Sequence, residues 1–295
     1  MGNEPITTKL VLEVAEIART HSGFNHTADF CITTKRAKYF FDQTSIEGDI
    51  SRIFFGYEDN DEKTEVVLKL ISDVSDNDLG QNEIKTLNHL FAEETAPQLK
   101  HLPRLLDQFI DAKTGQLGLI MTRFEGYDLR TVRKHRLYKD GVSDQHMAWI
   151  WCRLLSVLGY AHKKGIIHGN VEPSHILIQP RNHNLCLIDW TGSIFNEGFK
   201  ILNEDFSAPE VAEKQIPTPA ADLYSSGKCM VYLLGGDLKT NSIPSSVDAR
   251  MRQFLSYFLL PSPLQRAQDA WESYAQLENL RTEIWGEERF QEFEW

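Results

Sequence analysis

Clusters of apolar residues divide the chain into a first part with strand-like patterning and a second part with helical patterning. Short apolar runs punctuated by glycines and acidic clusters predict β-strands at residues 39–41, 53–55, 66–68 and 117–124. Apolar residues at helical spacing predict a helix over residues 82–91 and a long amphipathic helix after Ser143. The helical part is interrupted by two short strands, at residues 176–178 and 185–188. Strands first and helices later predict an α+β fold with a small β-rich lobe and a larger α-helical lobe.

The same pattern sets the expected domain boundaries. Leu10, Val14 and Ile17 have helical spacing, which predicts a short amphipathic helix over residues 10–18. We expect an N-terminal helical extension over residues 1–28 and a β-rich lobe over residues 29–125. The α-helical lobe is expected over residues 126–280 and a tail over residues 281–295.

Composition and charge exclude several classes of function. Lys and Arg number 31 and Asp and Glu number 42, so the net charge is −11. A chain this acidic is not expected to bind nucleic acid or anionic lipid through a basic surface. No stretch approaches the roughly 18 apolar residues of a membrane helix, and the first ten residues lack the features of a secretory signal. The four cysteines form no C-x-x-C pair, which predicts reduced thiols in a cytoplasmic protein.

The segment that carries chemistry begins at His168 and ends at Trp190. It contains the sequence His-Gly-Asn-Val-Glu-Pro-Ser-His, two short strands, and then Ile-Asp-Trp. This pattern resembles the catalytic and metal-binding loops of the protein kinase fold, H-R-D-x-x-x-x-N followed by D-F-G. The resemblance extends from about residue 39 to about residue 275. It implies a two-lobe protein kinase-like fold, in the manner of a divergent, bacterial-type Ser/Thr protein kinase.

Three residues of the expected β-rich lobe and its helix match nucleotide-binding positions of that family. Gly48 is the one glycine retained where kinases carry the glycine-rich loop, whose backbone approaches phosphates closely. Lys69 ends the third predicted strand, as the phosphate-anchoring lysine does. Glu83 follows fourteen residues later in a predicted helix, where the resemblance implies the ion-pair partner of that lysine.

The strand at residues 117–124 matches the strand that leads to the adenine site. The resemblance implies that Met121 is the gatekeeper and that the backbone from Thr122 to Phe124 contacts the adenine. It also places Asp128 where an acidic residue contacts the ribose.

Three landmarks of the α-helical lobe argue for the fold. Ala208-Pro209-Glu210 matches the A-P-E sequence that ends the activation segment. Asp222 begins a sequence similar to D-x-W-S-x-G, whose Asp braces the catalytic loop. Arg266 matches the arginine that pairs with the A-P-E glutamate, so we expect a buried Glu210–Arg266 ion pair.

The catalytic positions depart from the family pattern. The catalytic Asp is Asn170, and a carboxamide cannot accept the proton of a substrate hydroxyl. The lysine that neutralises the transferring phosphoryl group is Glu172, which reverses the charge there. The Asn that binds a second Mg²⁺ is His175, a weaker ligand for a hard cation. Gly169 replaces the Arg, and Gly192 lies one place later than in D-F-G.

Lys69, Glu83 and Asp189 remain, and the resemblance implies that these three could bind ATP with one Mg or Mn ion. Asp189 and His175 are the candidate metal ligands. The leading hypothesis is a catalytically impaired kinase (a pseudokinase) that acts as a nucleotide-responsive scaffold or regulator of a protein partner.

Two alternatives remain open. The second hypothesis is an enzyme that transfers a phosphoryl or nucleotidyl group to a protein substrate, using Lys69, Asp189 and His175. The third is a small-molecule phosphotransferase of the aminoglycoside or choline kinase type, which uses H-G-D and I-D-W. The tail, with Trp285, Phe290, Phe293 and Trp295, is expected to pack on the α-helical lobe.

Overall fold

The computed structural model describes residues 13–19, 29–195, 197–198, 203–287 and 290–295. Internal contacts divide the chain into two compact units. The first unit consists of Met1–Gly80 and Leu105–Arg123, and the second of Gln81–Arg104 and Phe124–Trp295. Each unit is described by itself.

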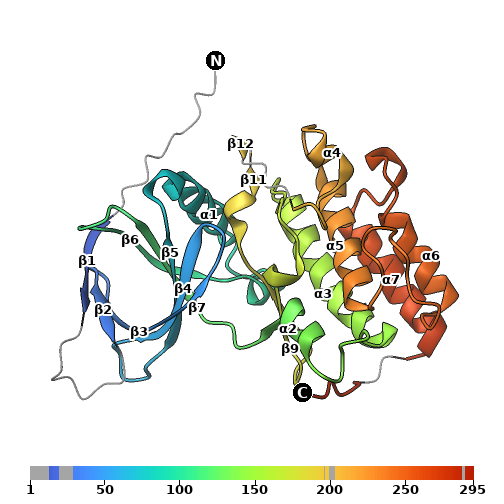
Figure 1. The fold of residues 1–295 in the computed structure, drawn as a ribbon, viewed down its shortest axis with the longest axis horizontal. Coiled ribbons are helices and arrows are strands. Elements are labelled where there is room, and N and C mark those ends of the chain that lie inside the picture. The colour runs from blue at the N-terminus through green and yellow to red at the C-terminus, as the bar shows by residue number, and fades with distance from the viewer. Residues whose placement is uncertain (1–12, 20–28, 196, 199–202, 288–289) are drawn as a thin grey trace. The chain divides into compact units, whose positions relative to one another are not determined.

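The first unit is a closed β-barrel, in which Figure 1 shows the strands curling round a common interior. Its strands are β1 (Glu13–Arg19), β2 (Phe30–Thr33), β3 (Lys38–Glu47), β4 (Ser51–Glu58), β5 (Glu65–Ile71), β6 (Leu105–Asp111) and β7 (Leu117–Thr122). They are hydrogen-bonded in the order β1-β2-β3-β4-β5-β7-β6, and β1 closes the barrel by pairing with β6. All neighbours are antiparallel except the parallel pair β1 and β6.

The barrel interior is filled by alternate residues of these strands. Tyr39 and Phe41 of β3, Phe54 of β4 and Leu68 of β5 belong to one buried cluster, because side chains two apart on a strand share a face. Gly56 permits β3 and β4 to approach here. A Cβ atom at this position would lie 2.0 Å from the carbonyl oxygen of Phe40, so no larger residue fits without a backbone shift.

The helix predicted over residues 10–18 is wrong, because residues 13–19 form strand β1. Residues 10–12 lie outside the described residues. Ala15 is 5% exposed and Ile17 packs on the same core cluster, so the apolar face repeats every two residues. Pairing with β2 on one side and β6 on the other supplies backbone hydrogen bonds that local spacing does not reveal. The expected N-terminal extension therefore contributes a strand to the barrel.

The second unit is mainly helical. Its helices are α1 (Asn77–Leu90, from Gln81 onward), α2 (Leu129–Lys134), α3 (Asp144–Lys163), α4 (Pro209–Ala212), α5 (Pro219–Leu233), α6 (Ala249–Phe258) and α7 (Ala270–Trp285). Its strands are β8 (Tyr127–Asp128), β9 (Ile176–Gln179), β10 (Asn184–Leu187), β11 (Ile194–Phe195) and β12 (Glu197–Gly198). Strands β10, β9 and β8 form an antiparallel sheet in that order. Strands β9 and β10 belong to the segment between α3 and α4.

Helix α3 is the centre of the second unit. The side chain of Ser143 caps its first turn by accepting a hydrogen bond from the backbone N–H of His146. The helix packs against α5 and α7, and Trp151 is completely buried. The indole N–H of Trp151 donates to the hydroxyl of Ser226 on α5 at 3.2 Å, which satisfies its polar atom inside the core.

The structure confirms the α+β fold and the strands and helices expected within residues 39–188. It places residues 81–104 in the second unit, whereas the sequence assigned them to the β-rich lobe. Helix α7 ends at Trp285, so the expected boundary at residue 280 falls inside a helix. All four cysteines are free thiols, and three of them are buried. None of the helices in the described part of the chain has both the length and the apolar character that crossing a membrane requires.

Candidate active site

A buried carboxylate at the start of α5 fixes the backbone of the loop that follows α3. Asp222, 1% exposed, accepts hydrogen bonds from the backbone N–H groups of His168 (2.8 Å) and Gly169 (2.9 Å) and from Nε2 of His162 (2.9 Å). Burial alone would raise the pKa of Asp222, but these hydrogen bonds and the nearby histidines lower it below its ordinary value. The bracing role that the sequence predicts for Asp222 is confirmed.

His168 is fully buried and neutral. Its Nδ1 accepts from the backbone N–H of Asn170 at 3.2 Å, and its Nε2 donates to the carbonyl oxygen of Ile188 at 3.1 Å. Burial lowers the pKa of His168 to about 4, against an ordinary value of 6.5. The next residue, Gly169, has φ +76°, and a Cβ atom there would lie 2.6 Å from the carbonyl oxygen of Gly192.

Asp189 projects its carboxylate from a left-handed backbone conformation, with φ +63°. The hydroxyl of Thr191 donates to Oδ1 at 2.8 Å, and Nε2 of His175 lies 3.1 Å from Oδ2. The following N–H, of Trp190, donates to Oε1 of Glu83 at 3.1 Å. Glu83 of α1 is 1% exposed. Because its carboxylate accepts this hydrogen bond, it helps to hold the Asp189 loop in place.

His175 faces acceptors on both sides of its ring. Its Nδ1 lies 2.9 Å from the carbonyl oxygen of Asn170, while its Nε2 faces Asp189 and lies 3.8 Å from Oε1 of Glu172. The ring of His175 therefore lies between the backbone of the loop and the carboxylate of Asp189.

Glu172 is 9% exposed and is held by residues that the sequence did not single out. Its carboxylate lies 3.6 Å from Nη2 of Arg130 in α2 and accepts a hydrogen bond from the side-chain amide of Asn203. Arg130 also donates from Nε to the hydroxyl of Ser174 at 2.7 Å and lies over the ring of Phe206. Glu172 therefore joins α2 and the segment before α4 to the loop that follows α3. No local sequence signal identifies Arg130 or Asn203 as its partners.

Helix α1 makes a second set of contacts with the segment after Asp189. The side-chain amide of Asn82 donates to the carbonyl oxygens of Thr191 (3.0 Å) and Ser193 (2.8 Å). The hydroxyls of Thr86 and Ser193 lie 2.6 Å apart. These residues were also not foreseen, although they lie within one turn of Glu83.

The other predicted nucleotide-site residues are placed as follows. In the first unit, Gly48 lies in the turn between β3 and β4, where its N–H donates to the carbonyl oxygen of Ser51 at 2.8 Å. Lys69, in β5, is 4% exposed, and Met121 and Thr122 end β7. In the second unit, Phe124 lies before β8.

The carboxylate of Asp128 caps helix α2. It accepts from the backbone N–H of Thr131 (2.9 Å) and from its hydroxyl (2.6 Å). Glu83, Asn170, Glu172, His175 and Asp189 are the predicted residues that the second unit brings together.

The residues of the second unit do not by themselves fit a divalent metal. In the described part of the chain, no group of three or more His, Cys, Asp or Glu side chains is arranged to hold a metal ion. Both oxygens of Asp189 already have partners, and Glu172 faces Arg130 and Asn203. Mg²⁺ requires several oxygen ligands in near-octahedral geometry, and Asp189 is one carboxylate beside an imidazole.

The expected ion pair between Glu210 and Arg266 is confirmed. Arg266 is completely buried and Glu210 is 4% exposed, and Nη2 of the arginine is hydrogen-bonded to Oε2 of the glutamate. The guanidinium also lies over the ring of Tyr224, 4.9 Å from its centre. The pair fixes the start of α4 against the loop before α7.

A model of the protein kinase domain matches residues 46–286, which is most of the chain. This protein belongs to the protein kinase domain family. Strands β1 and β2 precede the matched region of the kinase domain.

Known protein kinases from bacteria and eukaryotes are similar to this kinase domain. Serine/threonine-protein kinase B of Synechocystis sp. is 27% identical over 151 residues, covering 46% of this chain and 25% of that protein. Serine/threonine-protein kinase F of the same organism is 27% identical over 200 residues, covering 60% and 39%. A probable casein kinase II subunit alpha homolog of Encephalitozoon cuniculi is 26% identical over 188 residues, covering 60% and 53%. The chain thus spans between a quarter and about half of the length of these relatives.

Proposed function

We propose that this kinase domain does not catalyse ordinary phosphoryl transfer and acts instead as a regulator or scaffold of a protein partner. The observation that carries the proposal is the environment of Glu172. At the position where the resemblance implies a phosphoryl-neutralising lysine, the chain has a buried carboxylate that is engaged by Arg130 and Asn203. A side chain in this position holds the loop together and repels the charge that develops during phosphoryl transfer.

The neighbouring substitutions support the same conclusion. Asn170 cannot accept the proton of a hydroxyl nucleophile. The imidazole of His175 is engaged with Asn170 and Asp189 on its two sides. Phosphoryl transfer depends mainly on positioning and charge, so the loss of one of these groups could be tolerated. The loss of all three removes the base, the cation and a metal ligand together.

Nucleotide binding is part of the proposal. Lys69 is buried in the first unit, Glu83 is buried in the second, and Asp189 lies beside His175. The similar proteins are named as serine/threonine-protein kinases, a class that uses ATP with Mg or Mn. We propose that ATP binds this domain and that a divalent ion contributes little, because the donor set around Asp189 does not fit one.

A thermal unfolding experiment tests nucleotide binding. ATP should raise the midpoint of the wild-type chain, with similar shifts in Mg²⁺, Mn²⁺ and EDTA. A ligand at a hundredfold excess over Kd stabilises a protein by about 2.7 kcal/mol, which such a scan resolves. Lys69→Ala should abolish the shift, and Lys85→Ala, an exposed lysine of α1, should leave it unchanged. Absence of any shift in the wild type would overturn the nucleotide-binding part of the proposal.

A transfer assay tests the absence of kinase activity. With γ-labelled ATP and a generic protein substrate, the wild-type chain should transfer no phosphate above the level of an Asp189→Ala variant. The double variant Asn170→Asp with Glu172→Lys restores both chemical groups. Transfer of phosphate by this variant above the level of Asp189→Ala would show that these two positions limit transfer in the wild type. Labelling by the wild type that disappears in Asp189→Ala would refute the proposed scaffold role.

The second candidate function is transfer of a phosphoryl or nucleotidyl group to a protein substrate. One observation favours it: Asp189 keeps a left-handed backbone and a carboxylate oriented by Thr191 and His175. Comparing α-labelled with γ-labelled ATP separates nucleotidyl from phosphoryl transfer. A small-molecule phosphotransferase is disfavoured, because the Glu210–Arg266 pair and the family match both point to the protein kinase branch.

A further inference from the structure

Residues 290–295 lie along the surface of the second unit as a bound peptide would. They contain no helix or strand and carry aromatic side chains at the first, fourth and sixth positions. Phe293, the central anchor, is 3% exposed. Its ring lies 4.6 Å from that of Tyr138 and 4.8 Å from that of His146. A buried aromatic side chain of this kind provides most of the affinity of many peptide contacts.

The two outer aromatic residues stack on side chains from separate elements. Trp295 lies 3.7 Å from the ring of Tyr127, in β8, and 4.8 Å from that of His135, after α2. Phe290 lies 4.3 Å from the ring of His183, in the turn between β9 and β10. Phe290 is 63% exposed and Trp295 43% exposed, so both remain accessible to solvent on one side.

The backbone of the segment is bound through its carbonyl oxygens. Three side chains donate hydrogen bonds to these oxygens: His183 to Gln291 (2.9 Å), His146 to Glu292 (3.2 Å) and Tyr138 to Glu294 (2.7 Å). The hydroxyl of Ser143 lies 3.0 Å from Nδ1 of His146, which leaves Nε2–H as the donor. Main-chain contacts of this kind do not depend on the identity of the bound residues, so other sequences with the same aromatic spacing can make them.

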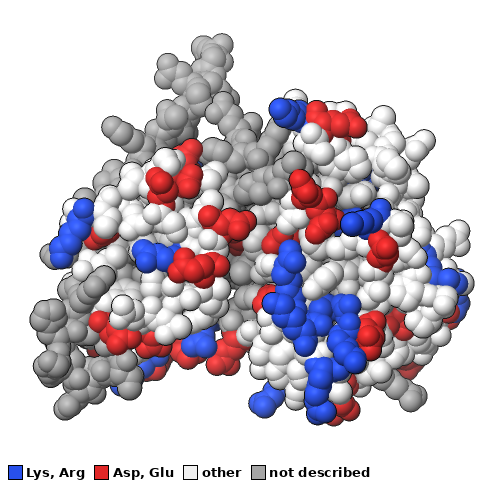
Figure 2. All heavy atoms as spheres, viewed as in Figure 1, with Lys and Arg blue, Asp and Glu red and all other residues white. Residues whose placement is uncertain are grey.

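The stretch of chain that contributes His135 and Tyr138 to this surface is basic, although the chain as a whole is acidic. Asp140 follows a run of five cationic residues. These are Arg130, Arg133, Lys134, Arg136 and Lys139. Figure 2 shows Lys and Arg side chains gathered over α2 and the loop after it. Lys134, Arg136 and Lys139 are exposed. The bound segment carries Glu292 and Glu294, so its charge is complementary to that of the surface.

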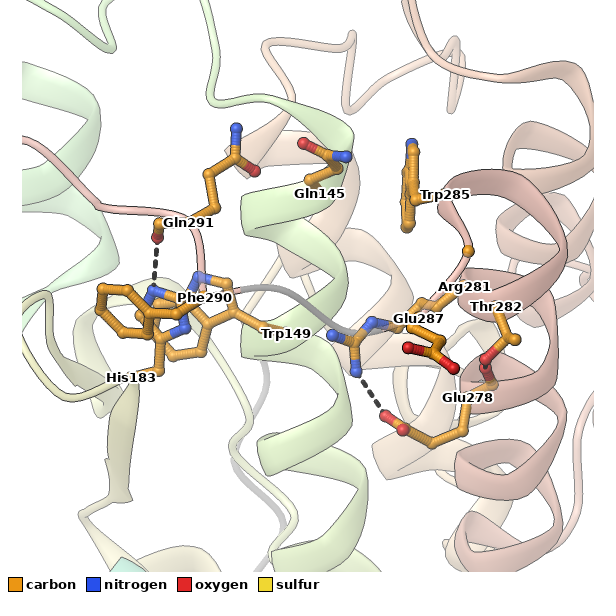
Figure 3. A pocket seen from close by; sticks show the side chains of 11 residues that line it. Gln145, Trp149, His183, Glu278, Arg281, Thr282, Trp285, Glu287, Phe290 and Gln291 are labelled. Carbon is orange, nitrogen blue, oxygen red and sulfur yellow. Dashed lines mark hydrogen bonds and ion pairs between the residues drawn. The ribbon is translucent and has the colours of Figure 1, made fainter.

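A partly open pocket of about 250 Å³ lies beside the first two residues of the segment, Phe290 and Gln291. Its other lining residues come from α3, from the last turns of α7 and the residues after it, and from the turn that holds His183, and include Gln145, Trp149 and Trp285. Figure 3 shows Phe290, His183 and Trp149 grouped along one edge of this pocket. The start of the segment is therefore bordered by solvent-accessible space, which leaves room for a competing peptide to approach.

We propose that this docking surface, formed by Tyr127, His135, Tyr138, His146, Trp149 and His183, binds an acidic peptide segment of a partner protein with aromatic residues at its first, fourth and sixth positions. Residues 290–295 occupy the surface in cis and compete with that partner. The proposal concerns the surface of the second unit and does not depend on nucleotide binding or catalysis.

Release of the intramolecular segment tests the proposal in the full chain. The probe is a fluorescein-labelled peptide with the sequence of residues 290–295, followed by fluorescence anisotropy. Wild type should bind it weakly, because the tethered segment competes at an effective concentration in the mM range. Phe293→Ala should bind it at least tenfold more tightly, because that substitution removes the buried anchor. Trp295→Ala, at a half-exposed position, is the second release variant.

Matched controls identify the surface that binds the peptide. Tyr257→Ala, an exposed aromatic of α6, should bind as weakly as wild type. Adding Tyr138→Phe, or Lys134→Glu with Arg136→Glu, to Phe293→Ala should reduce the affinity at least fivefold, with an unchanged circular dichroism spectrum. A scrambled peptide should not bind. The proposal is overturned if neither folded release variant binds more tightly than wild type, or if the scrambled peptide binds equally well.

Discussion

Arg266 is a side chain that the second unit cannot lose without stranding a buried charge. Its guanidinium is completely buried between Glu210 and the ring of Tyr224. Among the described residues, Oε1 of Glu210 and Nε and Nη1 of Arg266 have no further hydrogen-bond partner. The pair is therefore costly to bury, and each member depends on the other.

Substitution of Arg266 by Met should lower the free energy of unfolding by about 3–5 kcal/mol, because the carboxylate of Glu210 is then buried alone. Urea denaturation at pH 7 measures this change. The double variant with Glu210→Met should recover part of the loss, since no charge is stranded. Arg250→Met, which breaks an exposed ion pair with Asp248, should leave the midpoint unchanged. Equal effects of the two arginine substitutions would contradict this account.

Buried neutral histidines make the stability of the chain sensitive to acid. Burial lowers the pKa of His168 to about 4 and also lowers the pKa of His101 and His146. Between pH 6.5 and 4 the unfolded chain binds protons that the folded chain does not. Stability is therefore fully present above pH 6.5 and is lost as the pH falls towards 4.

From pH 7 to pH 5, His168 alone should reduce the free energy of unfolding by roughly 2 kcal/mol, at about 1.4 kcal/mol per pH unit below 6.5. Denaturation at pH 7, 6 and 5 measures the slope. His168→Gln should flatten it. A slope that is unaffected by His168→Gln would assign the acid sensitivity to other groups.

Among the elements, helix α1 is joined to the loop after Asp189 by polar contacts within the second unit. The amide of Asn82 donates to two carbonyl oxygens of that loop, and Thr86 contacts the hydroxyl of Ser193. Buried acceptors that lose their donor cost about 1–3 kcal/mol each. The conformation of the Asp189 loop therefore depends on the position of α1.

Asn82→Leu should make the amides of Thr191 to Ile194 exchange faster in hydrogen–deuterium exchange and should lower the free energy of unfolding by about 1–3 kcal/mol. The matched variant Lys85→Ala, at an exposed position of the same helix, should change neither quantity. If the exchange rates of the loop stayed the same in Asn82→Leu, the loop would not depend on these hydrogen bonds.

The sequence predicted two kinds of feature: helices and strands with a clear apolar pattern, and residues that match a motif of the protein kinase family. The buried partners Glu210 and Arg266, and the brace at Asp222, were implied by the resemblance to the protein kinase family. Strand β1 could not be predicted, because its conformation comes from pairing with β2 and β6. The contacts of Glu172 could not be predicted either, since they join distant segments through side chains that are common on protein surfaces.

At the scale of the whole molecule, the second unit is built from discontinuous segments. Residues 81–104 contribute the carbonyl of Leu90, which accepts from the hydroxyl of Tyr160 at 2.6 Å, and His101, whose Nδ1 lies 2.8 Å from the carbonyl oxygen of Leu185. The continuous stretch 124–295 lacks both contacts. The two units of this kinase domain are therefore not two independent stretches of chain.

A fragment over residues 124–295 should lack a fixed core, with weak near-ultraviolet circular dichroism and strong binding of the dye ANS. The full chain should show the opposite behaviour. A second fragment that begins at residue 81 and keeps α1 from Gln81 onward should recover part of the near-ultraviolet signal. A cooperative unfolding transition of the shorter fragment with native-like spectra would show that residues 81–104 are dispensable.

The backbone at Gly169 limits which residues this position can accept. The arginine of the family pattern has a side chain and a Cβ atom, yet φ +76° and the nearby carbonyl of Gly192 leave no room for one. Placing that arginine at position 169 requires a concerted movement of the loop that contains Gly192, whereas placing a lysine at position 172 sets a second cation beside Arg130. Of the two positions, Gly169 is the less open to a single substitution, because its constraint lies in the backbone. A variant that tests the family residues of this loop therefore has to keep the glycine.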